Sequence, residues 1–104
     1  MQLYGLKNCD TCRAARKALP EAEFVDVRES PLDRSILESA LERFGDALVN
    51  RSSTTWRGLS EDARARPPLD LLADHPTLMK RPLIVEGDRM LLGWTAATRA
   101  DLGV

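Results

Sequence analysis

The sequence predicts a single α/β domain over residues 1–104, in which a β-α-β half and a β-β-α half flank a helical insert at about residues 31–80. Three observations predict this fold. Two cysteines, Cys9 and Cys12, stand between a short apolar run and a helical pattern, as they do in α/β thiol redox sites. Strand-like runs occur near both ends of the chain, with helical patterns between them. A chain of 104 residues also has room for one modest core.

The first half begins with a strand at residues 2–6, which is followed by a helix. Asn8 or Cys9 is expected to cap this helix, and Pro20 ends it near residue 19 because proline cannot continue a helix. Residues 23–27 alternate in polarity, which is typical of a second strand. The short links from strand to helix to strand predict a parallel pair of strands with a right-handed crossover.

The longest helix of the insert is expected to begin at Ser30 and Pro31, because serine favours the N-cap and proline the first helical position. Gly45 is a natural C-terminal stop. An apolar face with spacings of three and four residues supports this helix. Its members are Ile36, Leu37, Ala40, Leu41 and Phe44.

Short helices and a second pair of strands are expected in the rest of the chain. The short helices fall at about residues 46–50, 59–65 and 68–74, and prolines separate them. Residues 83–86 and 89–92 have strand character, and the dipeptide Gly87-Asp88 between them is a two-residue hairpin signal. Thr95 is expected to cap a last helix that runs to about residue 102. The four strands would form one mixed sheet.

Neither the charge nor the hydrophobicity of the chain indicates binding to nucleic acid or to a membrane. Fifteen basic and 16 acidic residues leave a net charge of −1, so we expect no direct nucleic-acid partner. No apolar stretch approaches the roughly 20 residues of a membrane helix, and the N-terminus lacks a signal-peptide pattern. We therefore expect a cytoplasmic monomer, and in the cytoplasm a thiol pair is typical of catalysis or metal binding.

The cysteine pair has the spacing that a redox site needs. A thiol at Cys9 would face the unpaired N–H groups and the positive dipole end of the first helix, and both favour the thiolate. Cys12 lies roughly one helical turn further and can close a disulfide with Cys9. Nearby cations, among them Lys7, Arg13 and Arg16, would also favour the thiolate.

Cys9 and Cys12 could also belong to a zinc site or be two buried, inert thiols. A structural zinc site needs four ligands, and the chain offers only Cys9, Cys12 and His75, so we expect no metal. Cysteine is also often a small buried apolar residue. Two buried, inert thiols are therefore the remaining alternative.

Four stretches of the chain together resemble the arsenate reductase-like (ArsC) family. They are residues 3–16, 50–57, 80–84 and 90–94, and their order and separation cover nearly the whole chain. The family also includes Spx-type transcriptional regulators and YffB-type proteins. The segments Thr-Thr-Trp-Arg and Leu-Leu-Gly-Trp look most like the YffB-type branch. The resemblance implies a thioredoxin-like fold and places the nucleophilic cysteine at Cys9.

The resemblance also implies two arginines at the site. They are Arg51 in the helical insert and Arg81, which precedes a cis-proline at Pro82. A guanidinium group can hold an oxyanion or a carboxylate, such as arsenate or a carboxylate of glutathione, by paired hydrogen bonds. Backbone N–H groups from Thr11 to Arg13 would stabilise the thiolate or a bound anion. The residues expected to bind the substrate are Arg51, Asn8, Thr11, Arg13 and Pro82.

The chain departs from the resembled enzymes in two places. Glutaredoxin-coupled arsenate reductases carry a third arginine after the fourth strand, where this chain has Gly93-Trp94. They also usually lack a cysteine at the position of Cys12. Both departures count against efficient arsenate reduction.

The function expected from the sequence is therefore thiol–disulfide oxidoreductase chemistry, with electrons from glutathione or a glutaredoxin. Cys9 attacks a small anionic or disulfide substrate, Cys12 or glutathione resolves the intermediate, and Arg81 assists. No cofactor is bound, and glutathione is a co-substrate. Two alternatives remain: a true glutaredoxin-coupled arsenate reductase, and a non-enzymatic Spx-like regulator in which Cys9 and Cys12 form a redox switch.

Overall fold

The computed structural model describes residues 1–104, which form two compact units. Residues 1–30 and 81–104 make up one of them, here named the sheet unit, and residues 31–80 make up the helical unit. The bounds of the helical unit coincide with those expected for the insert. That the chain behaves as one domain stays a prediction.

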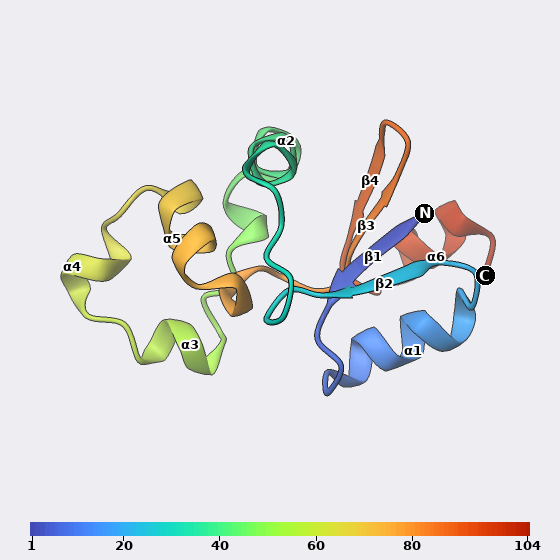
Figure 1. The fold of residues 1–104 in the computed structure, drawn as a ribbon, viewed down its shortest axis with the longest axis horizontal. Coiled ribbons are helices and arrows are strands. Elements are labelled where there is room, and N and C mark those ends of the chain that lie inside the picture. Colours follow the sequence, from blue (N-terminus) through green and yellow to red (C-terminus); the bar gives the residue numbers. More distant parts are fainter. The chain divides into compact units, whose positions relative to one another are not determined.

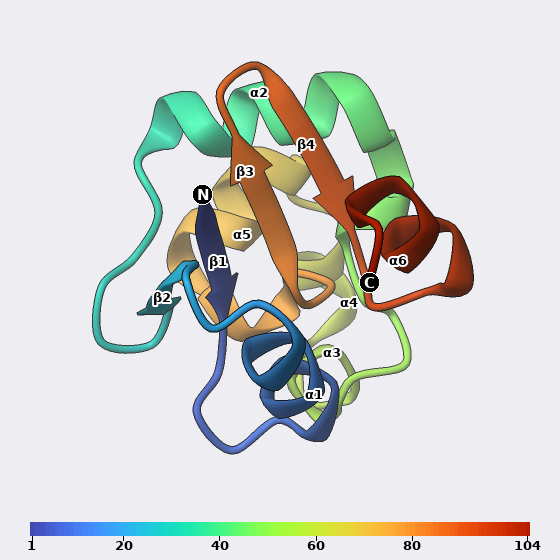
Figure 2. The same ribbon diagram turned by 90° about the vertical axis from the view of Figure 1, so that its right-hand side faces the viewer.

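The sheet unit is built on four strands in the order β2-β1-β3-β4 (Figure 2). They are β1 (Gln2–Gly5), β2 (Glu23–Asp26), β3 (Leu83–Glu86) and β4 (Arg89–Leu92). Strand β1 pairs parallel with β2 and antiparallel with β3, and β3 pairs antiparallel with β4. The expected mixed sheet and its parallel first pair are confirmed, and β1 lies inside the sheet.

Two helices lie on the same face of this sheet, α1 (Asp10–Ala18) and α6 (Ala96–Leu102) (Figures 1 and 2). The register explains the core beneath them. Leu3 is paired with Phe24 on one side and Ile84 on the other, so these side chains share one face. Leu3 and Ile84 are fully buried with Ala15 of α1. Leu102 of α6 packs against the same cluster.

The local signals at the ends of these elements are confirmed. Helix α1 has Cys9 as its N-cap and ends at Ala18, before Pro20. Gly87 lies in the β3–β4 turn with φ of +57°, a conformation that glycine adopts without strain. The hydroxyl of Thr95 accepts a hydrogen bond from the Thr98 N–H at 3.1 Å and so caps α6.

The helical unit contains α2 (Arg34–Phe44), α3 (Thr54–Arg57), α4 (Glu61–Arg64) and α5 (Pro68–Asp74). Two 3-10 helices, η1 (Gly45–Leu48) and η2 (Pro76–Leu78), complete it. The expected apolar face of α2 buries Leu37 and Ala40, and Gly45 ends the helix with φ of +57°. The other fully buried side chains of the unit include Leu48, Leu72, Leu78 and Met79.

The predicted start of α2 at Ser30 and Pro31 is wrong. The helix begins at Arg34 with Asp33 as its N-cap, and the Asp33 carbonyl accepts the Ile36 and Leu37 N–H groups. The Ser30 N–H instead donates to the carbonyl of Asp26 at 2.8 Å. Ser30 therefore belongs to the turn after β2.

No helix has both the length and the apolar character needed to cross a membrane.

Candidate functional site

The Cys9 thiol lies at the N-terminus of α1, as the sequence predicts. Cys9 has an extended backbone, with φ of −96° and ψ of 125°. Its carbonyl already accepts the first helical hydrogen bond, from the Arg13 N–H at 2.9 Å. Its side chain is half-buried, whereas Cys12, on the first turn of the helix, is fully buried. Both thiols are free.

The surroundings of Cys9 favour its thiolate. Burial raises the pKa of Cys9, but hydrogen bonds to the sulfur outweigh burial and lower the pKa from 9.0 to about 7. The donors are the Thr11 hydroxyl, the main-chain N–H and the thiol of Cys12, and the Arg81 guanidinium. Thr11 Oγ1 lies 3.2 Å from Cys9 Sγ. A thiol with this pKa is about half ionised at neutral pH.

Cys12 has the opposite character. Burial and the neighbouring Cys9 raise its pKa, whereas the Leu6 backbone and Arg81 lower it, and the net result is a rise from 9.0 to about 11. Cys12 therefore stays protonated at neutral pH. The pair therefore consists of a half-buried thiol that is partly ionised at neutral pH, Cys9, and a buried, protonated thiol that can donate a hydrogen bond to it, Cys12.

Gly5 is a site residue that the sequence analysis missed. A Cβ atom at Gly5 would lie 2.5 Å from Cys12 Sγ and 3.3 Å from Cys12 Cβ, which is closer than real side chains approach. Only glycine lets the end of β1 approach the buried thiol this closely. The available signal was the isolated glycine in a strand, which often marks such an approach.

Arg81 interacts with both thiols and directly precedes Pro82. The Arg81–Pro82 peptide bond is cis, as the resemblance implied, and Pro82 is fully buried just before β3. The Pro82 carbonyl accepts the Gly93 N–H at 2.8 Å, which ties this corner to the end of β4. The Arg81 guanidinium hydrogen-bonds Cys9 and lowers its pKa.

The other cations near the thiols are engaged elsewhere. Lys7 Nζ lies 2.9 Å from a Glu29 carboxylate oxygen. Arg13 is exposed and contacts Asp10 at 3.3 Å. The Arg16 guanidinium lies 4.2 Å from the centroid of the Phe24 ring. Of the cations expected to favour the thiolate, Arg81 is the one whose hydrogen bond to Cys9 lowers the Cys9 pKa.

Two of the residues expected to bind the substrate, Asn8 and Arg51, belong to different units of the chain. Asn8 is exposed in the turn before Cys9. Arg51 belongs to the helical unit, where its guanidinium lies 3.8 Å from an Asp46 carboxylate oxygen and 5.3 Å from the Trp56 ring centroid. The binding roles of Asn8 and Arg51, like those of Thr11, Arg13 and Pro82, stay predictions.

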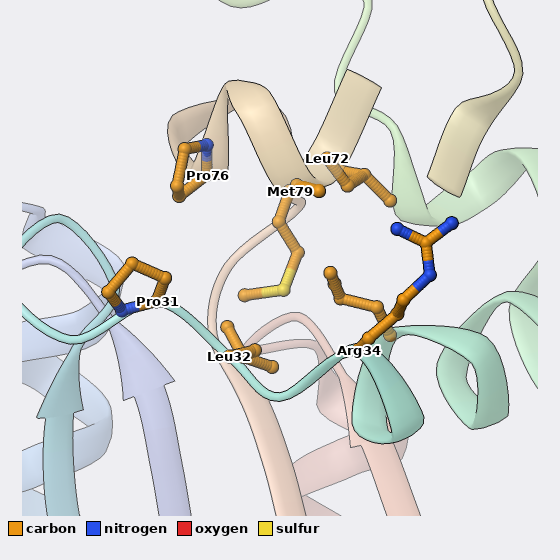
Figure 3. A pocket seen from close by; sticks show the side chains of 8 residues that line it. Pro31, Leu32, Arg34, Leu72, Pro76 and Met79 are labelled. Atoms are coloured by element: carbon orange, nitrogen blue, oxygen red, sulfur yellow. The ribbon is translucent and has the colours of Figure 1, made fainter. Parts of the chain in front are cut away.

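The helical unit has a small apolar hollow of about 80 Å³ (Figure 3). Its lining is Pro31, Leu32, Arg34, Leu37, Leu72, Ala73, Pro76 and Met79. None of the residues predicted to bind substrate or to react lines it.

Comparison with known proteins gives a consistent family. The model of the ArsC family matches residues 4–101. An uncharacterized protein of Haemophilus influenzae is 42% identical over 101 residues, which cover 88% of this chain and 89% of that protein. The global transcriptional regulator Spx of Streptococcus pyogenes serotype M3 is 33% identical over 103 residues, covering 88% of this chain and 76% of Spx. A solved structure of a YFFB protein is 32% identical, covers 96% of both chains and superposes with a TM-score of 0.87.

Proposed function

Because the chain belongs to the ArsC family and has its thioredoxin-like fold, we propose that it is a thiol–disulfide oxidoreductase with Cys9 as the nucleophile. The observation that carries this proposal is the polarised cysteine pair. The pKa of Cys9 is lowered to about 7 and that of Cys12 is raised to about 11. A thiol whose pKa is near the ambient pH is the best attacking group, since it is both ionised and nucleophilic.

The first step transfers glutathione to the protein. The Cys9 thiolate attacks the glutathione sulfur of a mixed disulfide, so that a Cys9–glutathione disulfide forms and the other sulfur leaves as a thiolate. The leaving thiolate takes a proton from solvent. The Arg81 guanidinium, beside Cys9, is placed to hold a carboxylate of the substrate by charge-assisted hydrogen bonds. The rest of the proposed binding surface is formed by the main-chain N–H groups of Thr11 and Cys12, the Arg13 side chain, Asn8 and Pro82.

The second step releases glutathione. Cys12 attacks Cys9 Sγ, its proton passes to the departing glutathione thiolate, and the Cys9–Cys12 disulfide forms. Two glutathione molecules, or a glutaredoxin dithiol, then return two electrons and restore both thiols. In the alternative route a second glutathione attacks the bound glutathione sulfur, frees Cys9 and forms oxidised glutathione. Neither route needs a bound cofactor, and both suit a monomer in the reducing cytoplasm.

Two further functions have support of their own. Arsenate reduction is supported by the family match and needs the same nucleophile: two thiols reduce arsenate to arsenite, with one oxygen leaving as water. For that reaction Arg81 would hold the oxyanion by paired hydrogen bonds. Redox-controlled regulation is supported by the similarity to Spx, and there the Cys9–Cys12 disulfide would be the signal and not a catalytic intermediate.

The experiment that separates these functions is a coupled assay of NADPH consumption with glutathione, glutaredoxin and glutathione reductase. Arsenate and a glutathione mixed disulfide are offered side by side. The proposal predicts turnover of the mixed disulfide, loss of activity in Cys9→Ser, and retained or reduced activity in Cys12→Ser. Turnover of arsenate would establish that the protein is an arsenate reductase. The absence of turnover with both substrates would overturn the enzyme proposal and leave the regulator.

A further inference from the structure

The loop before Cys9 is held by a residue far away in the sequence. Asp26 ends β2 and is paired with Gly5, the last residue of β1. One carboxylate oxygen of Asp26 accepts the main-chain N–H of Lys7 at 3.0 Å, 19 positions earlier in the chain. The other oxygen accepts the Arg28 N–H at 2.8 Å. The two oxygens therefore join the Cys9 loop to the turn that follows β2.

The main chain of Lys7 is fixed on both sides. Its N–H is bound by Asp26, and its carbonyl accepts the Arg13 Nε–H at 3.4 Å. Two residues later, the Cys9 N–H donates to the Leu6 carbonyl at 3.3 Å and closes the turn. A displacement of Lys7 would therefore move Cys9 at the start of α1.

The Asp26 carboxylate is held in its charged form. Partial burial raises the pKa of Asp26, but the main-chain N–H groups of Lys7, Arg28 and Glu29, together with the Lys7 charge, lower it below its ordinary value. The carboxylate is therefore a full acceptor over the whole neutral range. By contrast, the Lys7–Glu29 ion pair has both side chains well exposed, and such pairs fix little.

We propose that Asp26 is a positioning residue for Cys9: by fixing the Lys7 main chain, it keeps the Cys9 sulfur within reach of the groups that stabilise its thiolate. This inference rests on the proposed function, in which Cys9 is the nucleophile. Asp26 itself touches neither Cys9 nor a substrate in this account and acts through the loop alone.

Because Asp26 is negatively charged, a positioning role and a direct electrostatic effect on Cys9 can be told apart. A carboxylate near a thiolate repels it and raises the thiol pKa. If Asp26 acted by charge, its removal would lower the pKa of Cys9. If Asp26 acts by position, its removal weakens the hydrogen bonds from Thr11 and Arg81 and raises the pKa of Cys9. The two actions predict opposite signs. The other charged groups bonded to this loop or to Cys9 are Lys7, Glu29, Arg13 and Arg81. All of them remain in the Asp26 variants below.

The test is the pH dependence of Cys9 alkylation by iodoacetamide, read by mass spectrometry on the full chain. Asp26→Asn removes the charge and one acceptor, whereas Asp26→Glu keeps the charge but displaces the carboxylate. Both are expected to shift the profile upward by about one pH unit, which slows alkylation at pH 6 about tenfold. The control is Glu29→Gln, which removes a neighbouring carboxylate and leaves the Lys7 N–H bound. It is expected to leave the profile in place.

Each outcome bears on one proposal. If Asp26→Asn folds, as judged by circular dichroism, and its profile stays or moves to lower pH, the positioning role is wrong. If that variant does not fold, Asp26→Glu decides in the same way, since its charge is unchanged. If the wild type itself titrates near pH 9, the proposed nucleophile fails. A wild-type midpoint near 7 with unchanged Asp26 variants overturns the inference alone.

Discussion

The buried thiol of Cys12 lies against the main chain of Gly5, so close that a Cβ atom at Gly5 would come within 2.5 Å of the sulfur. Gly5 is paired with Asp26 of β2, and its carbonyl accepts the Val27 N–H at 3.0 Å. The strand is therefore held in place and cannot easily retreat from the thiol. Cys12, the resolving cysteine of the proposed mechanism, can occupy this position because residue 5 is a glycine and has no side chain.

The first prediction concerns this contact. Gly5→Ala is expected to destabilise the fold by about 1–3 kcal/mol, because an extra methyl group in a packed site forces side chains and backbone apart. Thermal or urea unfolding measures the loss. The matched control is Gly58→Ala, where the nearest atoms to a new Cβ lie at 3.6 Å and little change is expected.

A second variant shows whether the Cys12 sulfur causes that loss. In Gly5→Ala with Cys12→Ala, the atom nearest the new methyl group is gone. The double variant should therefore be more stable than the sum of the two single changes predicts. Simple additivity would contradict the contact.

The second prediction concerns Thr11. Its hydroxyl lies 3.2 Å from Cys9 Sγ and is the strongest of the groups that lower the Cys9 pKa. Thr11→Val removes the hydroxyl and keeps the shape, so the pKa of Cys9 is expected to rise by about half a unit or more. Alkylation of Cys9 at pH 6 should slow about threefold or more. Thr11→Ser keeps a hydroxyl and should restore the wild-type rate.

The third prediction concerns the pH dependence of stability. The pKa of Cys9 is lowered from 9.0 to about 7 in the folded protein. Its contribution to the free energy of unfolding is therefore complete above pH 9 and is lost as the pH falls toward 7. The pKa of Cys12 is raised from 9.0 to about 11, so its contribution is complete below pH 9 and is lost as the pH rises toward 11.

The two thiols together predict a stability maximum near pH 9. Chemical denaturation of the reduced protein between pH 6 and 10.5 measures it. Cys9→Ser should remove the gain between pH 7 and 9 and keep the loss above 9. A variant without Cys9 that shows the same gain as the wild type would contradict the lowered pKa.

The fourth prediction concerns Arg81. Arg81→Lys keeps the charge but loses the planar pair of donors that suits a carboxylate or an oxyanion. The KM for a glutathione mixed disulfide is expected to rise about tenfold, with a smaller change in kcat. Arg99→Lys, at an exposed position of α6, is the control and should change neither. An unchanged KM in Arg81→Lys would remove Arg81 from substrate binding.

Much of the fold could be predicted from local patterns. The strands β3 and β4 and the helix α5 were predicted with their observed bounds, because the Gly87-Asp88 turn and the proline at the start of α5 mark the ends of these elements. Helix α3 was not predicted, since two of its four residues are threonines, which favour helix only weakly. The Ser53 cap and the Arg64 side chain, which donates to the Trp56 carbonyl at 3.1 Å, stabilise it. The contact between Arg64 and Trp56 joins two short helices and cannot be predicted from the sequence of either one alone.

The candidate site divides in the same way. Cys9 and Cys12 could be found because their spacing within a strand-to-helix motif is itself the signal. Arg81 came from the family resemblance alone, since an isolated arginine before a proline has no local signature. Gly5 and Asp26 were missed because each acts on a residue that the folded sheet brings close. The start of α2 was misplaced for a different, local reason: the Ser30 N–H donates to the Asp26 carbonyl, which places Ser30 in the turn after β2.

The central claim is that Cys9 is an activated thiolate and that Cys12 is not. The most direct test is the rate of alkylation of each cysteine in the reduced wild-type protein from pH 5 to 10, followed by mass spectrometry. We expect a midpoint near pH 7 for Cys9 and almost no modification of Cys12 below pH 9. A Cys9 midpoint near 9, or equal labelling of the two thiols, would contradict it.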